Sequence, residues 1–158
     1  MDTTQSQSDS GLPSHQLLGI ALLVVRIMIG AIFIGHGAQK LFGFWHGPGM
    51  AGFTGMVAHM GFPLPGVFAY LAAISEFGGG LALIIGLLAR LGALGIAFSM
   101  LVAIFRVHLP NGLLGAGHDK PGFDFPLACL AGAAVIILLG AGHYSVDAIL
   151  AEVRRGRK

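Results

Sequence analysis

The chain has 158 residues, of which 55% are hydrophobic and only 10% are charged. Soluble domains carry roughly 25% charged residues, so this composition excludes an ordinary soluble domain and indicates a single integral membrane domain. The formal net charge is +2, and the basic residues are dispersed apart from a C-terminal cluster, which argues against nucleic-acid binding. Cys129 is the single cysteine, which excludes an intrachain disulfide and a cysteine-based metal cluster.

Residues 1–13 are rich in Ser, Thr and Gln and contain no Lys or Arg, a composition typical of disorder. The apolar run after them is longer than a signal-peptide core, so we expect an uncleaved first helix. Four apolar runs of about 20 residues each match the thickness of a bilayer core. They cover approximately residues 17–42, 66–88, 91–109 and 125–141. The sequence therefore predicts an all-α, four-transmembrane-helix bundle over residues 14–150.

The connections between these runs are polar or rich in helix breakers. The first connection contains Trp45, which suits the headgroup zone, and a short interfacial helix is expected near Phe53 to Met60. Pro110-Asn111-Gly112 ends the third run, and a polar loop that includes His118 leads to the fourth. Residues 151–158 form a basic tail.

Positive charges predict the orientation of the bundle. With four spans both termini lie on one side, together with Arg90, Arg154, Arg155, Arg157 and Lys158. The other side has only Lys40 and Lys120. Because cytoplasmic segments carry the excess of Lys and Arg, both termini are expected in the cytoplasm and the long loops outside.

Three strong charges interrupt the apolar runs: Arg26, Glu76 and Arg106. A charge at bilayer depth costs a few kcal/mol or more, so it persists mainly when it is paired, hydrated or functional. Counting about 1.5 Å per residue places Arg26 and Glu76 near mid-membrane. The same count places further polar residues in the outer third of the membrane: His36, Gln39, Lys40, Arg106 and His108. These residues together predict a polar pocket that opens outward.

The roles of these residues stay open between structure and chemistry. Glu76 is either the ion-pair partner of Arg26 or Arg106, or a proton-exchanging or ligand-binding carboxylate. Lys40 and Arg106 either reach the headgroups or attract an anionic or quinone-like head. His36 and His108 are interfacial residues, hydrogen-bond donors to a ligand, or metal ligands. Haem ligation is disfavoured because no c-type attachment motif is present, and no metal site is predicted.

Two patterns concern the helices themselves. Residues 28–43 and 100–115 share Met, Ala-Ile-Phe, His, Leu and Gly at an offset of 72 residues. This match predicts a parallel internal repeat of the first and third helices. The second and fourth helices do not align at that offset, so chance resemblance stays the alternative. Small residues at four-residue spacing, such as Ser75 and Gly79 or Gly95 and Ser99, indicate helix contacts.

Three ordered motifs resemble the DoxX family of small four-helix bacterial membrane proteins. The first contains Arg26-Ile27, Gly30, Phe33, Gly35-His36-Gly37 and Lys40-Leu41-Phe42-Gly43. The second is Glu76-Phe77-Gly78-Gly79 followed by Gly86-Leu87 and Arg90. The third is Gly140-Ala141-Gly142-His143-Tyr144-Ser145-Val146-Asp147, with Ala141 where the family has Pro. The resemblance implies a bacterial inner-membrane location and an association with quinone- or sulfur-compound-linked oxidoreduction and oxidative-stress complexes. It implies no established catalytic residue.

The first functional hypothesis is a subunit of a redox membrane system that binds a quinone-like partner in the outward pocket. Glu76, His36 and His108 are the candidates for proton handling, and a soluble or membrane partner protein would carry the electron-transferring cofactor. The pocket residues are Arg26, His36, Gln39, Lys40, Glu76, Arg106 and His108. The alternatives are a small transporter with Glu76 as its coupling carboxylate and a non-catalytic assembly subunit. Whether the chain is itself an enzyme, and whether it forms oligomers in the lipid bilayer, stays open.

Overall fold

A computed structural model describes residues 13–115, 117 and 120–157 of the chain. These residues form helices and turns without any strand, and three of the helices are long and apolar enough to cross a membrane. The predicted all-α membrane bundle is therefore confirmed. The segment of residues 1–12, predicted to be disordered, and the loop residue His118 lie outside the described residues.

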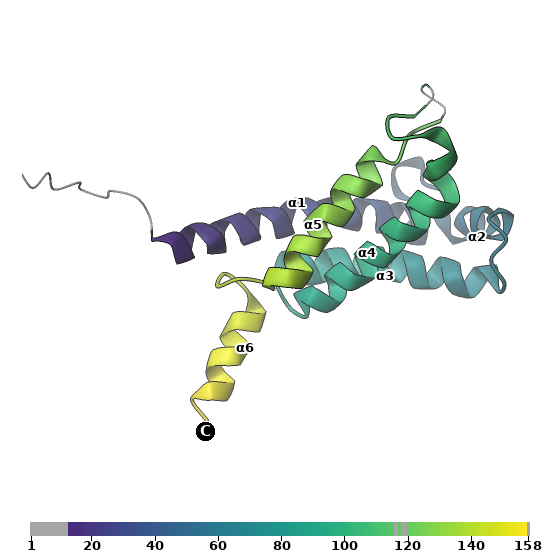
Figure 1. Cartoon of the computed structure of the whole chain (residues 1–158). Coiled ribbons are helices and arrows are strands. Elements are labelled where there is room, and N and C mark those ends of the chain that lie inside the picture. Colours follow the sequence, from purple (N-terminus) through teal and green to yellow (C-terminus); the bar gives the residue numbers. More distant parts are fainter. Residues whose placement is uncertain (1–12, 116, 118–119, 158) are drawn as a thin grey trace, which may run out of the picture.

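Four helices form the bundle. They are α1 (Ser14–Phe42), α3 (Pro65–Ile85), α4 (Ala89–Ala103) and α5 (Asp124–Leu139). The helix α1 packs along α3, α3 packs against α4, α4 packs against α5, and α5 returns to α1. In this ring α1 and α4 occupy opposite corners and run in the same direction, as Figure 1 lets the reader follow.

The two ends of the bundle differ. We call the end with the α3–α4 turn and residues 140–147 the turn end. The helix α6 (Val146–Arg155) leaves the bundle there. We call the other end, with α2 (Gly49–His59) and residues 109–123, the loop end (Figure 1). The helix α2 corresponds to the short helix predicted near Phe53 to Met60 and begins earlier, at Gly49.

The spans are unequal in length, which corrects the expectation of about 20 residues each. The apolar helices Ser14–Phe42, Pro65–Ile85 and Ala89–Asn111 have 29, 21 and 23 residues. In contrast, α5 has 16 residues, or about 24 Å at 1.5 Å per residue. It stops at Gly140, whose φ of 83° and ψ of −165° lie outside the helical region.

The end of the third span also departs from a regular helix. A π-helical turn, Ile104–His108, follows α4, and a 3-10 turn, Leu109–Asn111, follows that. A π-turn inserts one extra residue into a helical turn, and such insertions occur frequently at functional sites. Every residue beyond Ala103 is therefore rotated relative to its position in the continuous helix that the sequence predicted.

Glycines hold the helices close together. A Cβ atom on Gly37 of α1 would lie 2.5 Å from the backbone nitrogen of Phe77, and one on Gly30 would lie 2.8 Å from the carbonyl oxygen of Gly80. Between α3 and α4, a Cβ on Gly79 would lie 2.9 Å from the carbonyl oxygen of Gly92. These glycines therefore mark direct backbone contacts. Gly79 belongs to a predicted four-residue pair, with Ser75, whereas Gly30 and Gly37 stand outside that pattern.

The core is narrow and the periphery is apolar. Phe33, Ile96, Cys129 and Ile136 belong to a buried cluster between α1, α4 and α5, so Cys129 packs as a small hydrophobe. Large side chains such as Leu91, Phe98 and Leu138 point outward, with 64%, 66% and 75% of their surface exposed. An apolar surface of this kind suits the hydrocarbon of a bilayer.

Candidate functional site

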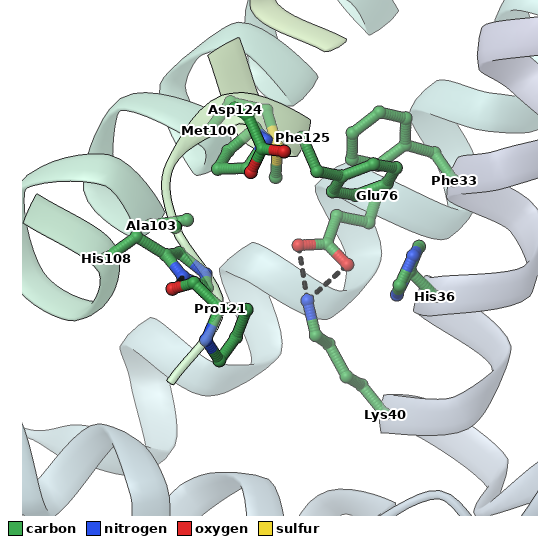
Figure 2. A pocket seen from close by; sticks show the side chains of 12 residues that line it. Phe33, His36, Lys40, Glu76, Met100, Ala103, His108, Pro121, Asp124 and Phe125 are labelled. Carbon is green, nitrogen blue, oxygen red and sulfur yellow. Dashed lines mark hydrogen bonds and ion pairs between the residues drawn. The ribbon is translucent and has the colours of Figure 1, made fainter. Parts of the chain in front are cut away.

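A buried ion pair joins α1 and α3 near the loop end. Both carboxylate oxygens of Glu76 accept hydrogen bonds from Nζ of Lys40, as the dashed lines in Figure 2 show. The side chain of Glu76 is 3% exposed and that of Lys40 is 21% exposed. Gly37 allows the two helix backbones to touch beside the pair, because a side chain there would collide with Phe77. The pair therefore satisfies a carboxylate in the middle of a membrane helix.

The expectation that Glu76 pairs with an arginine is wrong. Arg26 lies at the turn end, where its guanidinium donates four hydrogen bonds to backbone carbonyl oxygens. The acceptors are Leu83 at 2.7 Å, Ala141 at 2.7 Å, Tyr144 at 2.8 Å and Ile84 at 3.1 Å. Leu83 is seven residues beyond Glu76 along α3, which corresponds to a separation of about 10 Å. Counting depth from the start of the apolar run placed Arg26 at the level of Glu76, which the contacts contradict.

Arg26 instead stabilises the turn end. Its acceptors on α3 belong to the last turn of that helix, where carbonyl groups lack partners within the helix and the helix dipole is negative. Arg26 is almost completely buried, with 1% of its surface exposed. It therefore takes a structural role and does not line the candidate site.

The C-terminal motif completes this structural cluster. The two carboxylate oxygens of Asp147 accept hydrogen bonds from the backbone amides of Leu88 and Ala89, at 2.9 and 3.1 Å. The hydroxyl of Ser145 donates to the carbonyl of Gly142 and accepts from an amide of α6. A Cβ atom on Gly86 would lie 2.4 Å from Nη2 of Arg26. Residues of all three resembling motifs thus meet in this structural cluster.

Two cavities meet at the Lys40–Glu76 pair. The first, of about 360 Å³, lies between α1, α4 and α5, and its lining includes His36 and Asp124. The second, of about 490 Å³, lies between α2, α3 and α4 and is mainly apolar. Both are lined by Lys40, Glu76, Met100, Ala103 and His108. The ion pair is therefore part of the wall that the two cavities share.

Two histidines flank the ion pair. In Figure 2 His36 lies on the α1 side of the pair and His108 on the opposite side, next to Pro121. The ring of His36 contacts the rings of Phe33 and Phe125, with centroids 6.4 and 5.7 Å apart. Nδ1 of His108 lies 3.0 Å from the carbonyl oxygen of Pro121. If Nδ1 carries the proton and donates this bond, Nε2 is an acceptor.

The π-turn brings His108 to the cavities. In a continuous α-helix, residues that share a face with Ala103 follow at i+3 or i+4, so Val107 would follow it. The π-helical segment Ile104–His108 adds a residue, and His108, five residues after Ala103, lines both cavities with it. Val107 lines the second cavity as well, so the wall beside the ion pair includes both residues.

Three of the predicted pocket residues do not line either cavity. These are Arg26, discussed above, Gln39 and Arg106. Gln39 is packed against Gly47, because a Cβ atom on Gly47 would lie 2.6 Å from the backbone carbonyl oxygen of Gln39. Arg106 is exposed and lies over the ring of Phe62, with its guanidinium carbon 5.2 Å from the ring centroid. Arg106 and His108 are two residues apart, and residues at this spacing point to different faces of a helix.

Sequence reasoning missed several lining residues. Ser99 was interpreted only as a packing residue, and Pro121 and Asp124 were not singled out. The apolar residues of α2, including Phe53 and Met56, lacked any chemical signal. Within the described parts of the chain, His, Cys, Asp and Glu side chains do not gather in groups of three suited to a metal ion.

Comparison with known proteins places this architecture in a family. The DoxX family profile matches residues 21–109. The chain is 32% identical to the inner membrane protein YqjF of Escherichia coli (strain K12) over 135 residues, which cover 85% of this chain and 95% of that protein. It is 28% identical over 142 residues to the uncharacterized membrane protein Rv3486 of Mycobacterium tuberculosis (strain ATCC 25618 / H37Rv), covering 84% and 82% of the two chains.

No solved structure shows a significant match. The profile covers the Lys40–Glu76 pair, both flanking histidines and Arg26, while the C-terminal motif around Asp147 lies beyond it. The match to the Escherichia coli protein extends over nearly all of that protein's length, so the similarity concerns a whole membrane bundle. The chain therefore belongs to the DoxX family of membrane proteins.

Proposed function

We propose that this protein binds a lipophilic molecule with a polar head, such as a quinone, and serves as a subunit of a redox membrane system. The observation that carries the proposal is the buried Lys40–Glu76 pair in the wall that two largely apolar cavities share. Small-molecule sites typically combine an apolar volume of about 300–1,000 Å³ with a few convergent polar groups. The cavities of about 360 and 490 Å³ fit that description.

In this proposal the two cavities hold different parts of the ligand. The polar head lies near Lys40 and His36, whose nitrogen atoms donate hydrogen bonds to carbonyl oxygens. The apolar tail occupies the second cavity among Phe53, Met56 and Phe98, which line it. His36 and His108 pass protons to and from the head, because an imidazole ring can both donate and accept a hydrogen bond. A partner protein supplies the electrons.

The orientation is part of the same proposal. The turn end, with α6 and its arginines, faces the cytoplasm of a bacterium, and the loop end with both cavities faces outward. The support is the positive charge of the described residues at the turn end, Arg90, Arg154, Arg155 and Arg157, against Lys40, Arg106 and Lys120 at the loop end.

Equilibrium binding of decylubiquinone to the purified protein tests the proposal. Trp45 is the single tryptophan and is 68% exposed in the segment that follows α1, so its fluorescence can report binding at the loop end. We expect saturable quenching that weakens about tenfold in His36→Ala, because a charge-assisted or neutral hydrogen bond contributes roughly 1–2 kcal/mol. The matched control is Arg106→Ala, which changes an exposed residue outside both cavities and should bind like the parent. Absence of saturable quenching, or equal weakening by both variants, contradicts quinone binding at this site.

A transporter is the second candidate, because Glu76 lines both cavities and could exchange protons between them. In that case proton uptake by reconstituted vesicles depends on an added substrate and is lost in Glu76→Gln. Saturable quinone binding without substrate-dependent proton uptake favours the redox interpretation. An assembly subunit would show neither activity.

A further inference from the structure

We propose that α6 is a membrane-surface helix that binds anionic lipid headgroups at the turn end of the bundle. The sequence predicted only a basic tail over residues 151–158. The structure shows a helix from Val146 to Arg155 that none of the other helices covers, since none of its residues is buried. Three features of α6 point to a lipid surface as its partner: an apolar stripe, a basic end and its attachment to the rim of the bundle.

The apolar stripe runs the length of the helix. Val146, Ile149, Leu150 and Val153 follow one another at spacings of three, one and three residues, which places them on one face. Ile149, Leu150 and Val153 are 59%, 41% and 50% exposed. A short helix with an apolar face, a polar face and basic residues is the type that lies in the interface of a membrane.

The basic residues lie at the free end of the helix. Arg154 and Arg155 form its last turn and Arg157 follows. The acidic residues of this segment are Asp147 and Glu152, and the carboxylate of Asp147 is already bound to backbone amides of the bundle. The free end therefore has an excess of positive charge, which complements the negative charge of anionic headgroups.

The attachment of α6 places its base at the edge of the lipid-facing surface. The amide of Asp147 donates to the carbonyl of Gly86 at 2.9 Å, and Ser145 caps the helix through the amide of Ala148. Leu88 and Leu138, at the nearby ends of α4 and α5, are 61% and 75% exposed, so lipid-facing side chains extend to this level. In Figure 1 α6 leaves the bundle across the direction of α1. The geometry thus brings the stripe to the headgroup region and favours a lipid surface over a second copy of the chain.

The full-length protein in nanodiscs provides the test. In a Cys129→Ala background, an environment-sensitive fluorophore is attached at Ile149→Cys, on the stripe, or at Ala151→Cys, on the opposite face. We expect a blue shift for the label at position 149 in phosphatidylcholine nanodiscs with one quarter phosphatidylglycerol, and little shift for the label at 151. Amide hydrogen exchange of α6 in the unlabelled protein provides a second reading and should slow in the same nanodiscs.

Removing the positive charges at the end of α6 shows whether attraction to anionic lipid causes the blue shift and the slower amide exchange. Each arginine near an anionic surface contributes about a fivefold preference for the bound state. The variant R154Q/R155Q/R157Q should therefore lose most of the difference between anionic and pure phosphatidylcholine nanodiscs. The proposal is overturned if both label positions shift equally, if the shift ignores lipid charge and the three arginines, or if it occurs in detergent together with a dimer mass. The last outcome assigns the stripe to a second copy.

Discussion

A lysine and a glutamate buried beside two cavities depend on each other for their charge. Glu76 is 3% exposed and Lys40 is 21% exposed, so the two partners are unequally protected from water. Lysine has a long apolar stem that can move its ammonium toward water, whereas a short carboxylate in mid-helix cannot. Removing the lysine therefore has different consequences for stability from removing the carboxylate.

Lys40→Met should destabilise the bundle more than Glu76→Gln. The first change leaves a carboxylate without a counter-charge, and breaking a buried pair typically costs about 3–5 kcal/mol. The second leaves a lysine that can reach water. Thermal unfolding of the detergent-purified variants measures both effects, and the double variant Lys40→Met/Glu76→Gln should recover part of the loss. A Lys40→Met variant as stable as the parent contradicts a charged pair.

Arg26→Lys should also destabilise the protein, although it keeps the charge. A lysine ammonium is a single centre and cannot reproduce the planar fork that reaches carbonyls of both α3 and residues 141–144. Unpaired buried acceptors cost about 1–3 kcal/mol each. Arg106→Lys is the control because Arg106 is exposed.

The losses of stability from Arg26→Lys and Glu76→Gln should add in the double variant, since the two sites share no contact. If the two losses do not add, the result would support the Arg26–Glu76 pair that the sequence suggested.

At the scale of the helices, the contact of α1 with α3 rests on positions without side chains. A Cβ atom on Gly37 would lie 2.5 Å from the backbone of Phe77, while one on Gly35 would meet nothing within 4 Å. Two positions on the same helix thus separate a packing effect from a helix-propensity effect.

Gly37→Ala should lower the unfolding temperature, and Gly35→Ala should leave it unchanged or raise it. Alanine is favoured over glycine in a helix interior by about 1 kcal/mol, so only the steric collision at Gly37 gives destabilisation. Differential scanning fluorimetry of the two purified variants provides the comparison. Equal unfolding temperatures for the two would mean that α1 and α3 have room to separate, and the position of Lys40 beside Glu76 would lose its explanation.

For the whole molecule, the arrangement across the membrane follows from the ends of the bundle. The described residues His59 and Lys120 are exposed at the loop end, and Arg157 is exposed beyond α6 at the turn end. Gly47 is unsuitable for a cysteine probe because a Cβ atom there would lie 2.6 Å from Gln39.

Cysteines at His59 and Lys120 should react with an impermeant thiol reagent added to intact cells, and a cysteine at Arg157 should react only after the cells are opened. The reason is the positive charge at the turn end, which remains in the cytoplasm during insertion. The Cys129→Ala background removes the native thiol. Labelling in the reverse pattern would place the cavities on the cytoplasmic side.

The sequence by itself determined the class of the molecule. Long apolar runs, breakers such as Pro110 and Gly112, and small residues at four-residue spacing depend only on local chemistry, and they predicted an all-α membrane bundle with close helix contacts. It also singled out His36, Lys40, Glu76 and His108, which the structure brings to one cavity. Polar residues in an apolar run can be recognised from composition because burying them is costly.

Only the tertiary structure decided which partner each charged side chain binds. Arg26 pairs with backbone carbonyls rather than with Glu76, because the close packing of Gly86 and the loop after α5 deliver those carbonyls to it. His108 lines the cavities together with Ala103, five residues before it, because one extra residue in a π-turn rotates the chain beyond Ala103. Depth counted along a sequence assumes straight, regular helices that start at the same level. The long α1, the short α5 and the π-turn break that assumption, and long-range packing sets all three.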